Sequence, residues 1–211
     1  MIKINKDWKF EEIYPTISAY TTTYNCVDGK YPFEEAIRSF SWADEVVVVD
    51  GGSSDETRAR LQKLCDVYNN IKVYDIPIDL SDPGCDGAQK ALARAMCMYE
   101  FCLQFDADEV CGNTDDFDTR FKKLAKEMPP NVDMVSLPIF EFWGDPKDWN
   151  LRTDRHIWKW RLSRNKPEIT HSIPNYDRME IDGKIYSKGG SDGCFPVNIT
   201  NYEMISNYFH E

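Results

Sequence analysis

The sequence lacks any apolar run long enough to cross a membrane, and its first residues, MIKINKDWKFEE, lack the apolar core of a secretory signal. Basic residues are also few, because 25 Lys and Arg stand against 36 Asp and Glu and give a formal net charge of -11. Nucleic acids and anionic membranes both select for basic surface, so neither is expected as a nonspecific partner. The composition predicts a soluble, non-secreted protein with no transmembrane segment.

The cysteines contain no CxxC pair, and their odd number excludes a complete set of disulfides. Several of them fall inside apolar patterns, which favours buried, reduced thiols in a reducing compartment. We therefore expect a cytoplasmic protein, in the host cytoplasm if the chain is viral. The seven are Cys26, Cys65, Cys85, Cys97, Cys102, Cys111 and Cys194.

The stretch FCLQFDADEV, residues 101–110, reads as an apolar strand that ends in the carboxylates Asp106 and Asp108. Alternate side chains of an extended backbone point to the same face, so the two can enter one site. Carboxylates held this close repel one another unless a cation or a proton lies between them. Oxygen ligands of this kind suit Mg2+ or Mn2+, which complete their shells with water and phosphates.

Two other interpretations of this motif stay open at this point. Aspartates after strands are common because Asp accepts hydrogen bonds from its own turn, so the pair could be purely structural. An apolar strand followed by Asp-x-Asp-x-Val also resembles haloacid-dehalogenase-like phosphatases, in which Asp106 would be the nucleophile.

Strand and helix patterns alternate over the first half of the chain. Strands are expected at 17–24, 45–50, 71–76 and 101–105, and a fifth follows at 132–140. Helices are expected after residue 30, from about 55 to 68, from residue 88 to about 99 and at 117–127. This order predicts an α/β fold with a mostly parallel, Rossmann-like sheet and a ligand site at the carboxyl ends of its strands. Asp50 and Asp106 both fall at such ends.

The helical patterns also predict which side chains face the core. Those of the first two helices are Phe33, Ile37, Phe40, Leu61, Leu64, Cys65 and Tyr68. Those of the third helix are Ala91, Leu92, Ala95, Met96 and Tyr99.

The last third of the chain reads as loop-rich, and basic residues gather within it. An anionic ligand would be attracted to such a segment of an acidic protein, although a solvated strand face is the alternative. The basic residues are Arg152, Arg155, Lys159, Arg161, Arg164 and Lys166.

The segments EVVVVDGGSSDET, AQKALARAM and FCLQFDADEV, in this order and spacing, resemble family 2 glycosyltransferases of the GT-A fold. The likeness is greatest to small bacterial and viral sugar transferases with a VDGGS turn and a DADE motif. It continues more loosely through WKWRLSRN and ITHSIP. It implies one GT-A domain over residues 1–211, with a nucleotide-sugar half at about 17–110 and an acceptor-side half at about 130–211.

The resemblance also implies a donor site. Thr22 and Tyr24 would line the nucleotide base, and Asp50 would bind the base or the ribose. The family more often has a second acidic residue where this chain has Gly51, a departure that bears on the preferred base. Lys90 would lie near the donor.

The metal site implied by the resemblance is the DXD pair. Asp106 and Asp108 would hold Mn2+ or Mg2+, with Asp108 the more direct ligand of the ion that bridges the diphosphate. His171, in ITHSIP, falls where related enzymes can use a histidine near the metal or the diphosphate. A single histidine is also commonly structural.

Departure of a nucleoside diphosphate creates negative charge that a guanidinium can grip through two oxygens, which makes Arg161 and Arg164 candidates. An inverting reaction also needs a carboxylate to deprotonate the acceptor hydroxyl. Asp192 is the first candidate because glycines surround it, and Glu141 and Asp177 are alternatives.

The sequence thus predicts a metal-dependent glycosyltransferase that moves a sugar from a nucleoside-diphosphate sugar, expected to be a UDP-sugar, with inversion. The acceptor would be a glycan or a lipid-linked or protein-linked sugar. The alternatives are the phosphatase and a catalytically inactive, sugar-binding module of the same fold.

Overall fold

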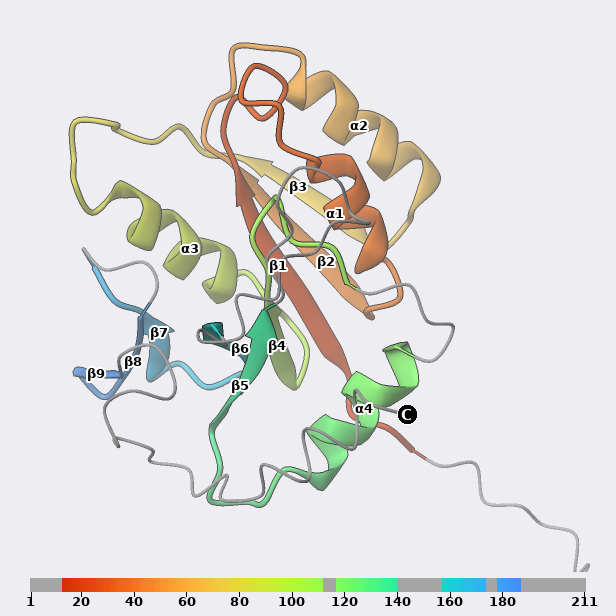
Figure 1. The fold of residues 1–211 in the computed structure, drawn as a ribbon, viewed down its shortest axis with the longest axis vertical. Coiled ribbons are helices and arrows are strands. Elements are labelled where there is room, and N and C mark those ends of the chain that lie inside the picture. The colour runs from red at the N-terminus through yellow and green to blue at the C-terminus, as the bar shows by residue number, and fades with distance from the viewer. Residues whose placement is uncertain (1–12, 112–116, 140–156, 174–177, 187–211) are drawn as a thin grey trace, which may run out of the picture.

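The computed structural model describes residues 13–111, 117–139, 157–173 and 178–186. Strands and helices alternate from the start of the chain and a run of short strands follows (Figure 1). The strands are β1 Ile17–Thr23, β2 Glu45–Asp50, β3 Ile71–Asp75, β4 Phe101–Gln104, β5 Met134–Ile139, β6 Ile157–Arg164, β7 Ile169–His171, β8 Met179–Ile181 and β9 Lys184–Tyr186. The helices are α1 Phe33–Ser39, α2 Thr57–Val67, α3 Cys85–Ala95 and α4 Phe117–Glu127.

The central sheet has six strands in the order β3-β2-β1-β4-β6-β5. The first four strands of this order pair in parallel, whereas β6 runs antiparallel to both β4 and β5. The predicted mostly parallel α/β sheet is therefore confirmed. In β2 every residue is buried, as expected for a strand of the run EVVVVD that is covered on both faces.

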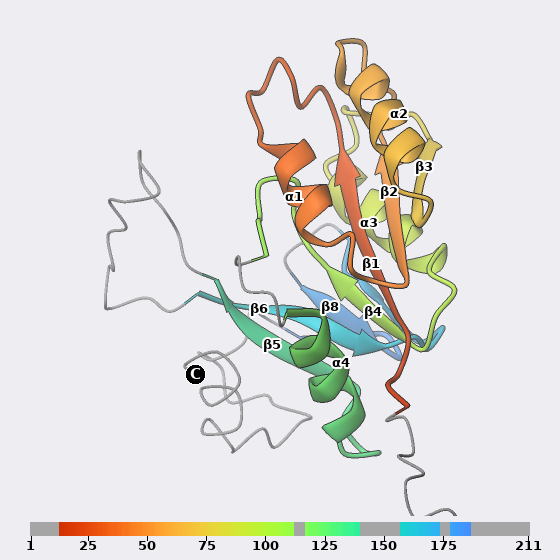
Figure 2. The same cartoon turned by 90° about the vertical axis from the view of Figure 1, so that its right-hand side faces the viewer.

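Helices cover both faces of the sheet (Figure 2). Side chains of α1, α2 and α4, among them Ile37, Leu61 and Leu124, form one core cluster with alternate residues of β1 and β2. On the other face Ala93 of α3 packs with Tyr20 and with the remaining β2 valines. This two-sided cover fixes the sheet and leaves the carboxyl ends of its parallel strands at one edge.

The predicted helix at 117–127 is confirmed, but the predicted core face of the third helix is largely wrong, since of its residues only Met96 packs against the core cluster of the described residues. The structure exposes Ala95 and Tyr99. It buries instead the face that carries Lys90 and Arg94. Hydrophobicity misassigned this face because both charged groups find hydrogen-bonding partners inside the protein.

The loop-rich interpretation of the last third is also incomplete. Residues 157–164 form β6, which lies between β4 and β5, and a separate three-stranded sheet has the order β7-β8-β9. Trp160, Ile169 and Met179 pack together between the two sheets. The six cysteines within the described residues are free thiols, and no helix in those residues is long and apolar enough to span a membrane.

Candidate functional site

Asp50 holds together the turn that follows β2. Its carboxylate accepts hydrogen bonds from Thr23 Oγ1 at 2.9 Å, from Ser53 Oγ at 2.7 Å and from Ser53 N at 2.8 Å, and the Gly52 amide lies 3.2 Å away. The side chain is completely buried. The structure therefore places Asp50 at the predicted strand end, where its carboxylate fixes the turn.

Two glycines give this turn its shape. Gly52 has a φ of +84°, a conformation that side chains with a Cβ rarely adopt. At Gly51 an added Cβ would come within 2.9 Å of Gln89 Nε2 and 3.1 Å of Ile78. A second acidic residue at position 51 would therefore have to displace the side chains of Gln89, in α3, and Ile78, in the loop before it, which explains the glycine by packing.

The loop after β1 is tied to the same turn. The Asn25 amide donates to Ser53 Oγ at 2.8 Å, and the Asn25 side-chain oxygen accepts from the Ser54 amide at 2.8 Å. Tyr24, one residue before, is 36% exposed, and Thr22 is half-buried at the end of β1. Both predicted base-lining residues thus lie beside the Asp50 turn, with the Tyr24 ring accessible.

Asp106, just beyond β4, is surrounded by positive charge. Lys90 Nζ lies 2.8 Å from Oδ1, whereas Lys159 Nζ and Arg161 Nη2 lie 3.0 and 3.2 Å from Oδ2. Gln104 Nε2 also donates to Oδ1 at 2.9 Å. Burial alone would raise the pKa of Asp106, but the charges of Arg161, Lys90 and Lys159 outweigh it and hold that pKa well below the usual range.

Glu109 completes this cluster. Its Oε1 accepts from Lys159 Nζ at 3.0 Å and from Arg161 Nη2 at 2.5 Å, and its Oε2 accepts from the Asp106 amide at 3.0 Å. Three cations therefore face two carboxylates at the carboxyl end of β4. Sequence reasoning missed Glu109 as a member of the site, although it follows Asp108, and it named Lys159, two residues before Arg161, only among the basic residues of the last third.

The antiparallel register of β6 explains why its cations reach Asp106. Leu103 pairs with Leu162. Because the two strands are antiparallel, the β6 residues before Leu162, among them Arg161 and Lys159, lie toward the carboxyl end of β4. The register of β6 against β5 shifts here and leaves Arg161 as an extra residue, and both the Arg161 and the Lys159 side chains reach the Asp106 carboxylate. The predicted Arg161 is thus brought to the site.

The structure places Arg164 at the opposite end of β4, where it pairs with Phe101. Its guanidinium donates to the Val132 oxygen at 2.9 Å and to the Met128 oxygen at 3.1 Å. These bonds anchor the segment between α4 and β5. Of the two predicted arginines, only Arg161 therefore lies beside the acidic pair.

Asp108 differs from Asp106 in its surroundings. It lies in an exposed turn, and within the described part of the chain it makes no hydrogen bond or ion pair. A free, solvated carboxylate is suited to a hard divalent cation, whereas every oxygen of Asp106 is already bound by cationic or amide donors. Among the described residues, no group of three or more His, Cys, Asp and Glu side chains is arranged to hold an ion.

His171, at the end of β7, is buried, and its Nε2 lies 2.8 Å from the Tyr20 hydroxyl. The two rings meet edge to face, with centroids 5.8 Å apart. Burial raises the pKa of Tyr20 far above its usual value. The phenol therefore stays protonated at neutral pH and can donate a hydrogen bond to the imidazole. The structure thus brings His171 to Tyr20 on the α3 side of the sheet.

Arg94 joins α3 to the segments that carry β6 and β7. Its guanidinium donates to the Ile169 oxygen at 2.7 Å, to Ser163 Oγ at 2.8 Å and to the Arg164 oxygen at 2.7 Å. It is 2% exposed. In the sequence, the only sign of this role was that Arg94 follows Lys90 by four positions, a spacing that places both on one helix face.

A close approach of backbones positions the end of β7. A Cβ on Gly87 of α3 would lie 2.6 Å from the Ser172 oxygen. The missing side chain lets residues 171–173 lie directly on the first turns of α3. Gly87 therefore determines where His171 lies.

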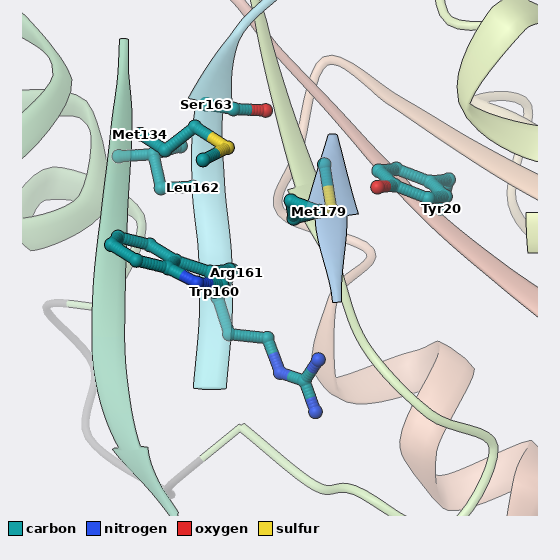
Figure 3. Close-up of a pocket in the computed structure, with 7 residues that line it drawn as sticks. All are labelled: Tyr20, Met134, Trp160, Arg161, Leu162, Ser163 and Met179. Carbon is teal, nitrogen blue, oxygen red and sulfur yellow. The ribbon is translucent and has the colours of Figure 1, made fainter. Parts of the chain in front are cut away.

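The space between β6, β8 and β1 is filled by side chains and leaves no room for a ligand. Figure 3 shows Met179 between Tyr20 and β6, and the Arg161 guanidinium extending away from Met134 and Ser163. Arg161 Nε, at this boundary, is buried and has no hydrogen-bond partner among the described residues. The functional end of Arg161 therefore belongs to the Asp106 cluster, while its stem packs in the interior.

The candidate bases Glu141, Asp177 and Asp192 lie outside the described residues. Their roles stay predictions from the sequence. Thiol chemistry is disfavoured at the described site, because burial raises the pKa of Cys26 to about 11 and that of Cys111 to about 12.

The class defined by this fold and this strand-end site is an α/β transferase of the GT-A fold. A family model described as glycosyl transferase family 2 matches residues 18–184, which is most of the chain. The chain belongs to this family.

Two solved structures are similar to part of this chain at low identity. A fragment of S. aureus TarS, 1-349, is 18% identical over 71% of this chain and 47% of that chain, with a TM-score of 0.45. Mannosyltransferase PcManGT from Pyrobaculum calidifontis, in complex with GDP-Man and Mn2+, is 22% identical over 64% of this chain and 37% of that chain, with a TM-score of 0.47. This chain thus spans less than half of either solved chain, and likeness at this level carries no argument about substrate.

Proposed function

We propose that this protein transfers a sugar from a nucleoside-diphosphate sugar to an acceptor hydroxyl. The observation that carries the proposal is the convergence of Lys90, Lys159 and Arg161 on the end of β4. Positive charge gathered at the end of β4 would stabilise a diphosphate leaving group as it develops negative charge. Membership in glycosyl transferase family 2 supports the same reaction class.

Asp108 is the proposed principal ligand of Mn2+ or Mg2+. Its carboxylate is exposed and uncommitted within the described residues, which fits a hard cation that shares its shell with phosphate oxygens. Asp106 and His171 are further proposed ligands, but each is engaged by other side chains in this structure. A bound divalent ion would neutralise charge on the departing diphosphate.

The other residues proposed to contact the nucleotide-sugar lie at or near the carboxyl ends of the strands. Arg161 and Lys90 are proposed to contact the diphosphate, and the accessible Tyr24 ring is proposed to stack on the base. Thr22 would complete the base side, and Asp50, whose buried carboxylate is bound by Thr23 and Ser53, would shape the base and ribose side by holding its turn. Arg164 receives no support for a diphosphate role, because backbone carbonyls occupy its guanidinium.

Inversion, a UDP-sugar donor and a glycan, lipid-linked or protein-linked sugar acceptor remain proposals from the family resemblance. Asp192 is the first proposed base and Glu141 the second, because inversion requires a carboxylate at the acceptor hydroxyl. A cytoplasmic site of action agrees with the free thiols among the described cysteines.

The phosphatase alternative is disfavoured by the match of residues 18–184 to glycosyl transferase family 2. A catalytically inactive module would share the donor site, and only an assay of transfer separates it from an enzyme.

The test replaces Asp108 by Asn and measures Mn2+-dependent binding of UDP by calorimetry, together with release of UDP from UDP-sugars. Loss of one ligand charge is expected to weaken the metal-dependent binding at least about tenfold without altering the thermal melt. Asp66→Asn is the matched control, because Asp66 is exposed in α2 and, among the described residues, accepts a single hydrogen bond, from Gln62 at 3.1 Å. Wild-type metal dependence in the Asp108 variant would refute the assignment.

A further inference from the structure

In this structure Asp106 is saturated with donors. Lys90 and Gln104 occupy Oδ1, and Lys159 and Arg161 occupy Oδ2, all at 2.8 to 3.2 Å. A carboxylate offers about four lone-pair directions, so none is left for a metal ion. Nearby positive charge would also repel a divalent cation. Of the two DXD carboxylates, Asp106 is therefore kept from a metal ion by the protein's own cations, whereas Asp108 is not.

The cations around Asp106 differ in how firmly they are held. The Arg161 side chain is 8% exposed and that of Lys90 is 9% exposed, whereas the Lys159 side chain is 21% exposed. Lysine also carries its charge on a flexible stem that has three rotatable donors. Lys159 is thus the cation that can leave Asp106 with the least rearrangement.

The direction in which Lys159 could move is set by charge. Its present partners are the carboxylates Asp106 and Glu109, each at 3.0 Å. A diphosphate at the end of β4 carries more negative charge than either carboxylate and accepts charge-assisted hydrogen bonds. When such an anion arrives, Lys159 gains a stronger partner and Oδ2 of Asp106 loses one of its donors.

We propose that Lys159 is an exchangeable counter-ion: it blocks Asp106 in the empty site and moves to the donor's diphosphate, which opens Asp106 to the divalent cation. This inference rests on the proposed donor site and adds Lys159 to it. Because linkage is reciprocal, the diphosphate promotes metal binding by the same factor by which the metal promotes diphosphate binding. Without a bound nucleotide-sugar, Lys159 stays on Asp106, and the site therefore binds a free divalent cation only weakly.

The proposal predicts effects of opposite sign when the Lys159 charge is removed. In Lys159→Met, Mn2+ alone should bind about tenfold more tightly, the effect of removing one unit charge roughly 6 Å from a divalent ion at water-like dielectric. UDP in the presence of Mn2+ should bind at least about fivefold more weakly, because the diphosphate has lost a cationic partner. A merely structural role for Lys159 would not tighten the binding of the metal.

The experiment measures Mn2+ affinity from the electron paramagnetic resonance signal of free Mn2+, without nucleotide, and UDP affinity by calorimetry at saturating Mn2+. Lys166→Met is the matched control, because Lys166 follows the other end of β6 and pairs with Asp133 at 2.7 Å. Lys159→Gln serves as a second variant that keeps a hydrogen-bond donor without the charge. Near-ultraviolet circular dichroism reports whether each variant is folded.

Tighter Mn2+ binding in both Lys159 variants, together with weaker UDP binding, would support the exchange. Mn2+ affinity equal to that of Lys166→Met would overturn it, while UDP binding to the wild type would leave the donor site standing. Failure of the wild type to bind UDP at any Mn2+ concentration would instead refute the proposed function. The two failures are therefore distinguishable.

Discussion

Replacement of Arg94 by Lys tests whether α3 holds β6 and β7 in place. The guanidinium reaches three acceptors on two strands: Ser163 and Arg164 of β6 and Ile169 of β7. A lysine ammonium can retain a charge and one of these bonds, but its single nitrogen cannot reach all of them. At least one backbone oxygen is then left buried without its donor.

The cost can be worked from this geometry. A hydrogen bond from a charged group contributes about 1.5 to 3 kcal/mol, and contributions within one network are not additive. Losing two such bonds should therefore lower the free energy of unfolding by about 3 kcal/mol. With a urea m-value of about 2 kcal/mol/M, the unfolding midpoint should fall by about 1.5 M.

The assay is urea denaturation followed by circular dichroism, with Arg38→Lys as the matched control. Arg38 is an exposed α1 residue whose ion pair with Glu34 spans 3.4 Å, so this variant should lose less than about 0.5 kcal/mol. A midpoint for Arg94→Lys that matches the control would refute the anchoring role of Arg94.

Two further predictions concern packing and pH. Gly87→Ala should destabilise the protein by about 1 to 2 kcal/mol in thermal unfolding, because its Cβ would meet the Ser172 backbone oxygen at 2.6 Å. Gly84→Ala is its control, since there the Cβ would meet side-chain atoms of Ile173 and Asp82, at 2.6 and 3.3 Å, and not backbone; equal melting of the two variants would count against the backbone approach at Gly87. Burial would raise the pKa of Glu45, but bonds from Lys72 and neighbouring donors outweigh it and lower that pKa, so the carboxylate stabilises the fold above its unfolded pKa of about 4.3. Glu45→Gln should cost about 1 to 2 kcal/mol at pH 7, and this difference should shrink as the pH falls through the folded pKa; a difference independent of pH would contradict the role of the charge.

The sheet and the strand-end carboxylates could be predicted from the sequence because their signals are local. The run EVVVVD has the apolar pattern of a strand buried on both faces, and β2 covers residues 45–50 as expected. The helix at 117–127 has a strong period of its own and was predicted with correct ends. Asp50 and Asp106 followed from their places at strand ends.

The rest of the site depended on long-range pairing that no local pattern shows. Arg161 and Lys159 reach Asp106 because β6 inserts antiparallel beside β4, more than fifty residues away in sequence. The buried face of α3 was not predicted because Lys90 and Arg94 are charged. The cost of burying these charges is offset by hydrogen bonds to residues of other segments, which hydrophobicity does not show. Hydrophobic periodicity therefore identified the helix but not its orientation.

The central claim is that the strand-end cluster is a metal-dependent nucleotide-sugar site. The most direct measurement is calorimetric titration of the chain with UDP, GDP, CDP and dTDP, each with and without Mn2+. The account predicts that one diphosphate, UDP, binds tightly and only when Mn2+ is present. If none of the four nucleotides binds, with or without the metal, the result contradicts this claim.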